Sequence, residues 1–449
     1  MNSTVRLNFS RLTAIFCNRA IYNLDRSNFW TKNRGLILVS LCAFIAVLLW
    51  RSWPNFSHPG LYVEDTSHYF NYFYGDTRDL SSLLHNPNGY YNLINNFIAL
   101  LVAKIDVRLQ PSLYLWAGTF LAICAVMILP CSGLLTNRYL IFLAPFLLGL
   151  SGLNHLFYYI TLTYQIYVLV IILIGLLFWQ PLKGNTANIF LFVLLSLLIW
   201  SGPYSVLVVP FSFCFILFFR GKTWLLLFLS IVTILYTLSV TEHMILLRNL
   251  FKPEIHRIWF NALIGRVFFM GMKGAVGPVK LVITGAFFLI TLTILRKDPF
   301  YLKIGCILLI LINSSLAALF LSKKFLLALR ILPCYILIAQ FLWLSFLLFT
   351  ADRILARNKK LYHGGLVVCA LAVMFIYYDN SYNPAKGSVP VMTSLPKYLD
   401  RVYEAEQQKL AEQNRTQIIR LGDYNFSPIA KLGRVGDPTV PVELIQVDE

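Results

Sequence analysis

Long runs of apolar residues, separated by short polar segments, recur along almost the whole of this 449-residue chain. Most runs approach or exceed the roughly 18 residues that an α-helix needs to cross a bilayer. They are continuous in Leu, Ile, Val and Phe, whereas a membrane β-barrel would alternate apolar and polar positions. Since the backbone in lipid must satisfy its own hydrogen bonds, the pattern predicts an all-α polytopic membrane protein.

About eleven transmembrane helices are predicted, and two of them, 139–153 and 187–201, are short. The Ser201-Gly202-Pro203 sequence either kinks one long helix over 187–219 or separates two helices. The predicted spans are 35–52, 112–130, 139–153, 156–180, 187–201, 203–219, 223–240, 277–295, 303–320, 326–350 and 362–378.

The basic residues distinguish these alternatives and orient the chain. The leader 1–34 carries six Lys or Arg residues against one acid, and positive flanks stay in the cytoplasm. With eleven spans, every short basic loop falls on the cytoplasmic side. A single span over 187–219 would instead move the cluster from Arg353 to Lys360 outside. The Ser201-Gly202-Pro203 turn is therefore predicted at the outer surface.

This topology divides the chain into a cytoplasmic basic leader (1–34), a transmembrane domain (35–378) and a periplasmic tail (379–449). Two long loops, 53–111 and 241–276, fall on the outer side. Within the first, apolar residues recur at helical spacing over 93–101, behind a Gly/Asn turn. That helix is too short to span, so we expect it to lie in the outer interface.

Composition agrees with a membrane protein and excludes a soluble one. The chain is 58% hydrophobic and 13% charged, against about 25% charged residues in soluble domains. The basic residues that give the net charge of +18 lie between the predicted spans, where lipid phosphates attract cations. No nucleic-acid partner is therefore predicted. The eight cysteines form no CxxC pair, which gives no support for a zinc or redox site.

Two adjacent carboxylates, Glu64 and Asp65, follow the first span within an aromatic stretch. At a water–membrane boundary with apolar neighbours, one of them could have a raised pKa and act as a general base. The pair could instead hold a divalent metal with a phosphate, or be solvated acids of a loop. The nearby His68 is a candidate acid/base group or ligand, although its spacing from other histidines fits no zinc motif.

Tyrosines accompany these acids. Tyr90 and Tyr91 precede the predicted interfacial helix, where they could stack on a sugar ring or belong to an aromatic interface belt. Tyr204 follows the Ser201-Gly202-Pro203 turn. With His68, Tyr90 and Tyr91, it is a candidate for lining a substrate cavity.

Together, these features resemble the GT-C glycosyltransferase superfamily, and more narrowly its bacterial members that use a polyprenyl-phosphate sugar. The resemblance rests on the acidic pair in the first outer loop and on the Tyr-rich Gly turn before an interfacial helix. Three further segments are similar: 201–205 at the head of a span, 161–167 at the outer end of a span, and Arg330-Ile331-Leu332-Pro333. The serotype-converting O-antigen glucosyltransferases are the nearest subgroup in size and layout.

The resemblance implies an inverting transferase in the bacterial inner membrane. A sugar on polyprenyl phosphate would pass to a lipid-linked glycan or an envelope polysaccharide, such as lipopolysaccharide O-antigen, at the outer face. Glu64 or Asp65 would be the catalytic base and Arg330 would bind the donor phosphate. No cofactor is implied with certainty, and a divalent metal remains an alternative.

The predicted outer surface is basic, which is unusual because positive charges favour the inside. Arg330 stands near the outer end of its span, Lys324 precedes it, and Arg257 lies in the second outer loop. An anionic lipid headgroup would suit these three side chains. Interfacial snorkelling of long cations is the simpler explanation.

Two other functions fit parts of the pattern. A flippase or transporter of lipid-linked glycans would show charges at mid-membrane and pseudo-symmetric halves. An O-antigen polymerase would depend on arginines in large outer loops, which the 241–276 loop contains. The discriminating question is whether Glu64 and Asp65 face the same cavity as Arg330.

Overall fold

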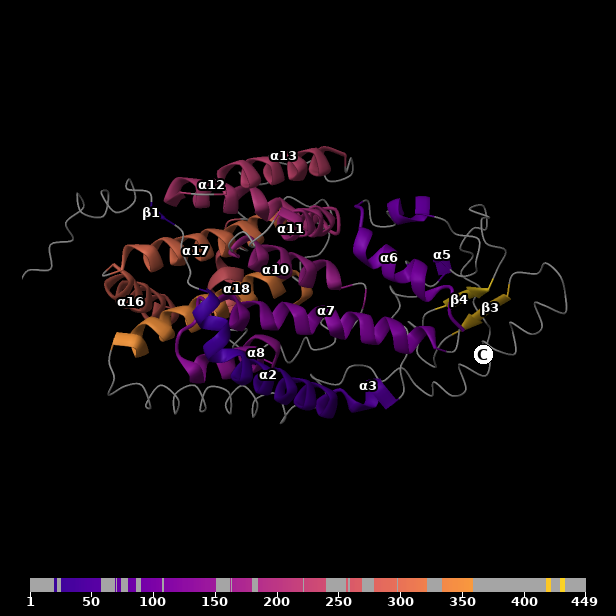
Figure 1. Ribbon diagram of the computed structural model, residues 1–449, viewed down its shortest axis with the longest axis horizontal. Helices are drawn as coiled ribbons and strands as arrows, with labels where there is room; N and C mark the ends of the chain where they lie inside the picture. The colour runs from indigo at the N-terminus through magenta and orange to yellow at the C-terminus, as the bar shows by residue number, and fades with distance from the viewer. Residues whose placement is uncertain are drawn as a thin grey trace, which may run out of the picture.

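The computed structural model is built almost entirely of helices (Figure 1). It describes residues 20–21, 26–57, 69, 71–73, 80–85, 90–106, 109–150, 162, 164–179, 185–220, 222–239, 256, 259–268, 278–296, 298–320, 333–357, 417–420 and 429–432.

The first half of the chain contains α2 (Arg26–Arg51), α3 (Trp53–Ser57), α5 (Asn71–Phe73), η2 (Leu80–Leu84), α6 (Leu93–Val102), α7 (Gln110–Ser132), α8 (Arg138–Leu150), α10 (Gln165–Leu177) and α11 (Asn185–Ile199). The second half contains η4 (Pro203–Leu207), α12 (Val208–Phe218), α13 (Thr223–Ser239), the π-helix η6 (Ala262–Phe268), α16 (Pro278–Leu295), α17 (Pro299–Phe320) and α18 (Pro333–Arg357). Strands β1 (Ala20–Ile21) and β2 (Phe219–Arg220) pair in parallel, and β3 (Gln417–Arg420) pairs antiparallel with β4 (Ile429–Leu432).

Five of the described helices are long and apolar enough to cross a membrane, namely α2, α7, α16, α17 and α18. The pair formed by α11 and η4–α12 adds a sixth if it is one span. All predicted spans except 362–378, which lies outside the described residues, overlap a described helix. Several of these helices have fewer than 18 residues, so the count of about eleven spans is not confirmed.

The chain bends sharply at Ser201-Gly202-Pro203. The axis of α11 and that of the η4–α12 segment differ by 118°. Proline begins η4, where its missing N–H removes no helical hydrogen bond. One straight helix over 187–219 is thereby excluded.

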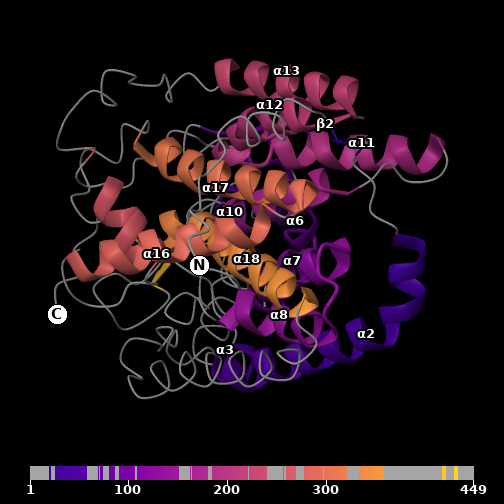
Figure 2. The same ribbon diagram turned by 90° about the vertical axis from the view of Figure 1, so that its left-hand side faces the viewer.

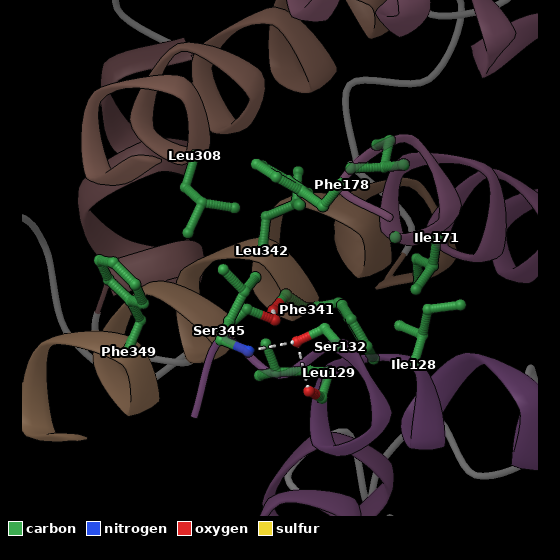
Figure 3. A pocket seen from close by; sticks show the side chains of 13 residues that line it. Ile128, Leu129, Ser132, Ile171, Phe178, Leu308, Phe341, Leu342, Ser345 and Phe349 are labelled. Carbon is green, nitrogen blue, oxygen red and sulfur yellow. Dashed lines mark hydrogen bonds between the residues drawn. The ribbon is translucent and has the colours of Figure 1, made fainter. Parts of the chain in front are cut away.

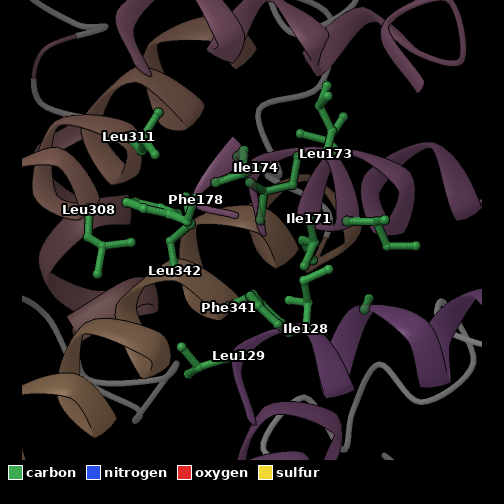
Figure 4. Close-up of a cluster of buried hydrophobic side chains, with 14 of the residues drawn as sticks. Ile128, Leu129, Ile171, Leu173, Ile174, Phe178, Leu308, Leu311, Phe341 and Leu342 are labelled. Atoms are coloured by element: carbon green, nitrogen blue, oxygen red, sulfur yellow. The ribbon is translucent and has the colours of Figure 1, made fainter. Parts of the chain in front are cut away.

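The hydrophobic core lies where α7, α10, α17 and α18 meet (Figure 4). Gly175 allows the close approach of α10 to α7, because a Cβ at this position would stand 2.3 Å from Cγ1 of Ile128. In the most apolar 18-residue stretch of α18, 89% is buried inside the bundle, whereas only 11% of the corresponding stretch of α16 is buried. Figure 2 accordingly shows α16 at the margin of the bundle and α18 near its middle.

The short basic turns gather at one end of the bundle. Nζ of Lys222 donates to the carbonyl of Leu177 at 3.4 Å, and Nζ of Lys303 donates to the carbonyl of Phe218 at 3.3 Å. The β1–β2 pair lies at this same end (Figure 1). We call it the basic end, made of residues 133–138, 177–179, 218–220, 222, 295–296, 298–303 and 352–357. That it faces the cytoplasm stays a prediction.

The opposite end, which we call the α6 end, carries α5, α6, β3 and β4 (Figure 1). Strand β4 contacts α5. The strand pair of the tail therefore lies beside α5, which belongs to the segment 53–111. That this end faces the periplasm stays a prediction.

A fully buried carboxylate, that of Asp352, ties α18 to the α7–α8 turn. It accepts hydrogen bonds from the backbone amides of Thr136 (2.9 Å) and Asn137 (2.6 Å) and from the hydroxyl of Thr136 (2.9 Å). Arg353 forms an ion pair with it and stacks over the ring of Tyr301, with 3.6 Å between Cζ and the centroid. Helices α17 and α18 and the α7–α8 turn thus share one charged contact.

This contact corrects the sequence interpretation of Arg353, which was placed in a loop beyond the span 326–350. Helix α18 continues to Arg357, and Arg353 is only 9% exposed. The helix continues because the adjacent carboxylate and the aromatic ring of α17 stabilise the guanidinium where apolar side chains alone would not.

We expect Asp352→Asn to lower the free energy of unfolding by about 3 kcal/mol, since breaking one partner of a buried ion pair leaves the other uncompensated. The apparent melting temperature of the purified protein in detergent measures the change. Asp298→Asn, at a partly exposed carboxylate of the same end, is the matched control. Equal melting temperatures for the two variants would contradict this role of Asp352.

Candidate functional site

The structure describes three of the residues that the sequence singled out, Tyr90, Tyr91 and Tyr204, and places them at the α6 end. The predicted acids, cations and histidine lie outside the described residues, and their roles stay predictions. These are Glu64, Asp65, His68, Arg257, Lys324 and Arg330.

The α6 helix is the short element predicted over 93–101. Its ten residues extend about 15 Å, half of the hydrocarbon core. The bent α11–η4 segment holds its first turn: the amide of Leu93 donates to the carbonyl of Trp200 at 3.3 Å, and the amide of Ile94 to Oγ of Ser201 at 3.1 Å. Two of the orphan donors of the helix start are thus satisfied by another part of the chain.

One face of α6 is polar and buried. Asn95 and Asn96 are 0% exposed and Asn92 is 4% exposed. Nδ2 of Asn95 donates to the carbonyl of Leu162 at 2.7 Å, and Nδ2 of Asn92 donates to the hydroxyl of Tyr69 at 3.0 Å. The asparagines therefore connect α6 both to the chain before α10 and to the loop that holds the predicted acids.

The third asparagine extends this connection. Nδ2 of Asn96 donates at 2.8 Å to the carbonyls of Leu83 and His85. The His85 ring in turn stacks on Tyr72. Tyr69, Leu83 and His85 are therefore anchored on α6.

The Oδ1 atoms of the three asparagines, and the buried Oγ of Ser205, accept no hydrogen bond from the residues that the structure describes. A buried oxygen without a donor costs about 1–3 kcal/mol. This end of the bundle consequently offers several acceptor atoms to hydroxyl or amide donors.

Aromatic rings surround the bend. Tyr91 stacks on Trp200 with 5.7 Å between centroids, and Trp200 contacts Tyr236 edge-on at 5.5 Å. The hydroxyl of Tyr236 donates to the carbonyl of Tyr91 at 3.2 Å. On the other side of the bend, Tyr204 lies 5.1 Å from Tyr167. Tyr91 and Tyr204 therefore flank the same turn, while Tyr90 is partly buried against the core.

The sequence interpretation missed Asn92, Asn95 and Asn96. Their spacing of three and four places them on one face of a helix, and three amides on a short apolar helix were the available signal. It was overlooked because asparagines near a Gly turn are also typical of loops.

A small cavity of about 40 Å³ lies away from this site, between α7, α10, α17 and α18 (Figure 3). Its polar lining is engaged locally: Oγ of Ser132 donates to the carbonyl of Leu129 at 2.7 Å and accepts from the amide of Leu134 at 3.0 Å. Oγ of Ser345 donates to the carbonyl of Phe341 at 2.9 Å. The remaining lining is apolar, so this cavity is a packing gap.

The described helices define a helical protein able to cross a membrane several times. No family model, no curated protein and no solved structure matches the chain. The resemblance to GT-C glycosyltransferases therefore rests on the sequence motifs.

We expect Ser201→Ala to loosen the start of α6, because it removes the acceptor of the Ile94 amide. The loss is about 1 kcal/mol, and hydrogen exchange of the amides in 93–97 measures it. Ser196→Ala is the matched control, since Oγ of Ser196 also donates within α11, to the carbonyl of Phe192. If both variants exchange alike in 93–97, Ser201 does not cap α6.

Proposed function

We propose that this protein is a GT-C-type glycosyltransferase of the bacterial inner membrane. It transfers a sugar from a polyprenyl-phosphate donor to a lipid-linked glycan or envelope polysaccharide, at the face of the membrane where α6 lies. The observation that carries the proposal is the docking of α6, with its buried asparagines, on the bent α11–η4 segment. Two elements that support the resemblance, far apart in sequence, are neighbours in space.

The exposure of α6 suits a lipid-borne substrate. Its outward residues are apolar, with Phe97 48% and Leu101 50% exposed, while its asparagines face the protein. A helix in water would show the reverse distribution. This arrangement supports a position in lipid, with a polar site on the protein side of the helix where a glycan headgroup can reach it.

The proposed chemistry is a direct displacement. Glu64 or Asp65 removes the proton of the acceptor hydroxyl, and the resulting oxygen attacks the anomeric carbon. The bond between that carbon and the phosphate oxygen breaks, and polyprenyl phosphate leaves with the bonding electrons. Arg330, with Lys324 and Arg257, compensates the charge on the departing phosphate.

The described residues near this site suit the sugar. Tyr91 and Tyr204 supply aromatic surface on which a sugar ring packs, while the buried Asn92 and Asn95 hold α6 in place beside them. His68 belongs to the same loop as the acids. A divalent metal held by Glu64 and Asp65 is the alternative role for that pair.

The placement of buried charge favours a reaction at one face over a carrier. A carrier needs polar groups along a path between the two faces. Within the described ranges, the strongly buried charged side chains are Lys303, Asp352 and Arg353. All three lie at the basic end and bond to neighbouring helices or turns, so they hold the bundle together.

We expect Glu64→Gln or Asp65→Asn to lower sugar transfer by about 100-fold or more, as loss of a general base does. Membranes that contain the variant are supplied with polyprenyl-phosphate sugars, and glycan products are measured at matched protein levels. Asp106→Asn, at an exposed carboxylate of the same loop, should keep normal transfer.

Arg330→Ala should weaken use of the donor without loss of folded protein. Normal transfer by all three variants would remove both the base and the phosphate site. If the unmodified protein transfers no sugar, the carrier and polymerase functions take precedence.

A further inference from the structure

A second and larger cavity, of about 260 Å³, lies at the basic end between α10, α11 and α13. Its polar lining consists of Trp179, Asn188 and Lys222, and most of the remaining lining is leucine. No residue of α6 lines it, and it takes no part in the proposed transfer.

The cavity changes character with depth. Lys222 and Trp179 stand at the ends of α13 and α10, and Asn188 in the first turn of α11. Leu195 lines the cavity seven residues further along α11, which corresponds to about 10 Å. The lining is therefore polar where α10 ends and α13 begins, and apolar further along α11. A phospholipid, with a charged headgroup and apolar chains, requires such a change.

Neighbouring residues mark this end as a membrane interface. Trp224, in the first turn of α13, is 85% exposed, and exposed tryptophans are typical of the headgroup level. Arg220 is exposed two residues before Lys222. Next to the cavity, Ile189 and Phe190 of α11 are 62% and 67% exposed, which is the surface expected of a lipid-facing helix.

We infer that this cavity binds one anionic phospholipid of the adjacent leaflet. An acyl chain occupies the apolar part along Leu191, Leu195 and Leu226, and the phosphate lies at Lys222. The cation selects an anionic headgroup, as basic pockets between transmembrane helices do. This inference is independent of the proposed transferase activity.

Native mass spectrometry of the whole protein in mixed micelles tests the inference. The micelles contain phosphatidylglycerol and phosphatidylcholine with identical acyl chains. The unmodified protein should retain one phosphatidylglycerol in preference to phosphatidylcholine. Lys222→Gln should lower that preference about fivefold, the contribution of one cation near a charged headgroup.

Arg220→Gln is the matched control, because it removes the same charge two residues away without lining the cavity. It should keep the preference within about twofold of the unmodified protein. Leu195→Trp, which fills the apolar part, should remove the bound lipid while the melting temperature stays near that of the unmodified protein. Equal retention of both lipids by the unmodified protein, or equal loss in the Lys222 and Arg220 variants, would overturn the inference.

Discussion

The α6 end depends on two hydrogen bonds that backbone amides at the start of α6 donate to the bend after α11. Unpaired backbone amides are costly when they are buried, so the first turn of α6 needs partners from elsewhere in the chain. Trp200 and Ser201 supply them, and they are free to do so because the chain turns at Pro203. The asparagine face and the Tyr91–Trp200 stack take their positions from this junction.

The two ends of the bundle differ in chemistry. The basic end is held by charge: Asp352 and Arg353 join α18 to α17 and to the α7–α8 turn, and Lys303 bonds to α12. The α6 end is held by amides, hydroxyls and aromatic rings. Neutral polar groups of this kind suit uncharged sugars, whereas the basic end suits lipid phosphates. The division agrees with the proposed transfer at the α6 end and with the proposed phospholipid at the basic end.

The apolar runs of the sequence locate the helices well, because the demand for internal hydrogen bonds leaves helices as the solution for a chain like this. They do not settle how many helices cross the membrane. Several described helices have fewer than 18 residues, so their positions depend on tertiary contacts that the apolar runs do not show. Because Arg353 is charged, the sequence interpretation placed it in a loop. It remains in α18 because it contacts Tyr301 and the α7–α8 turn, and both are distant from it in the sequence. Tyr91 and Tyr204 were identified as candidate site residues from the motifs around them in the sequence. Asn95 was not, because its partner Leu162 is 67 residues away. Glu64, Asp65 and Arg330 remain predictions from the motifs.

The central claim is that polyprenyl phosphate binds at the α6 end. The most direct measurement is photo-crosslinking in membranes with a polyprenyl phosphate that carries a diazirine next to the phosphate, followed by peptide mapping. An excess of phosphatidylglycerol keeps the anionic-lipid cavity at the basic end occupied. The account predicts crosslinks within 58–105 and 321–333 that unlabelled polyprenyl phosphate competes away. Crosslinks confined to 177–222, or unaffected by that competitor, would contradict it.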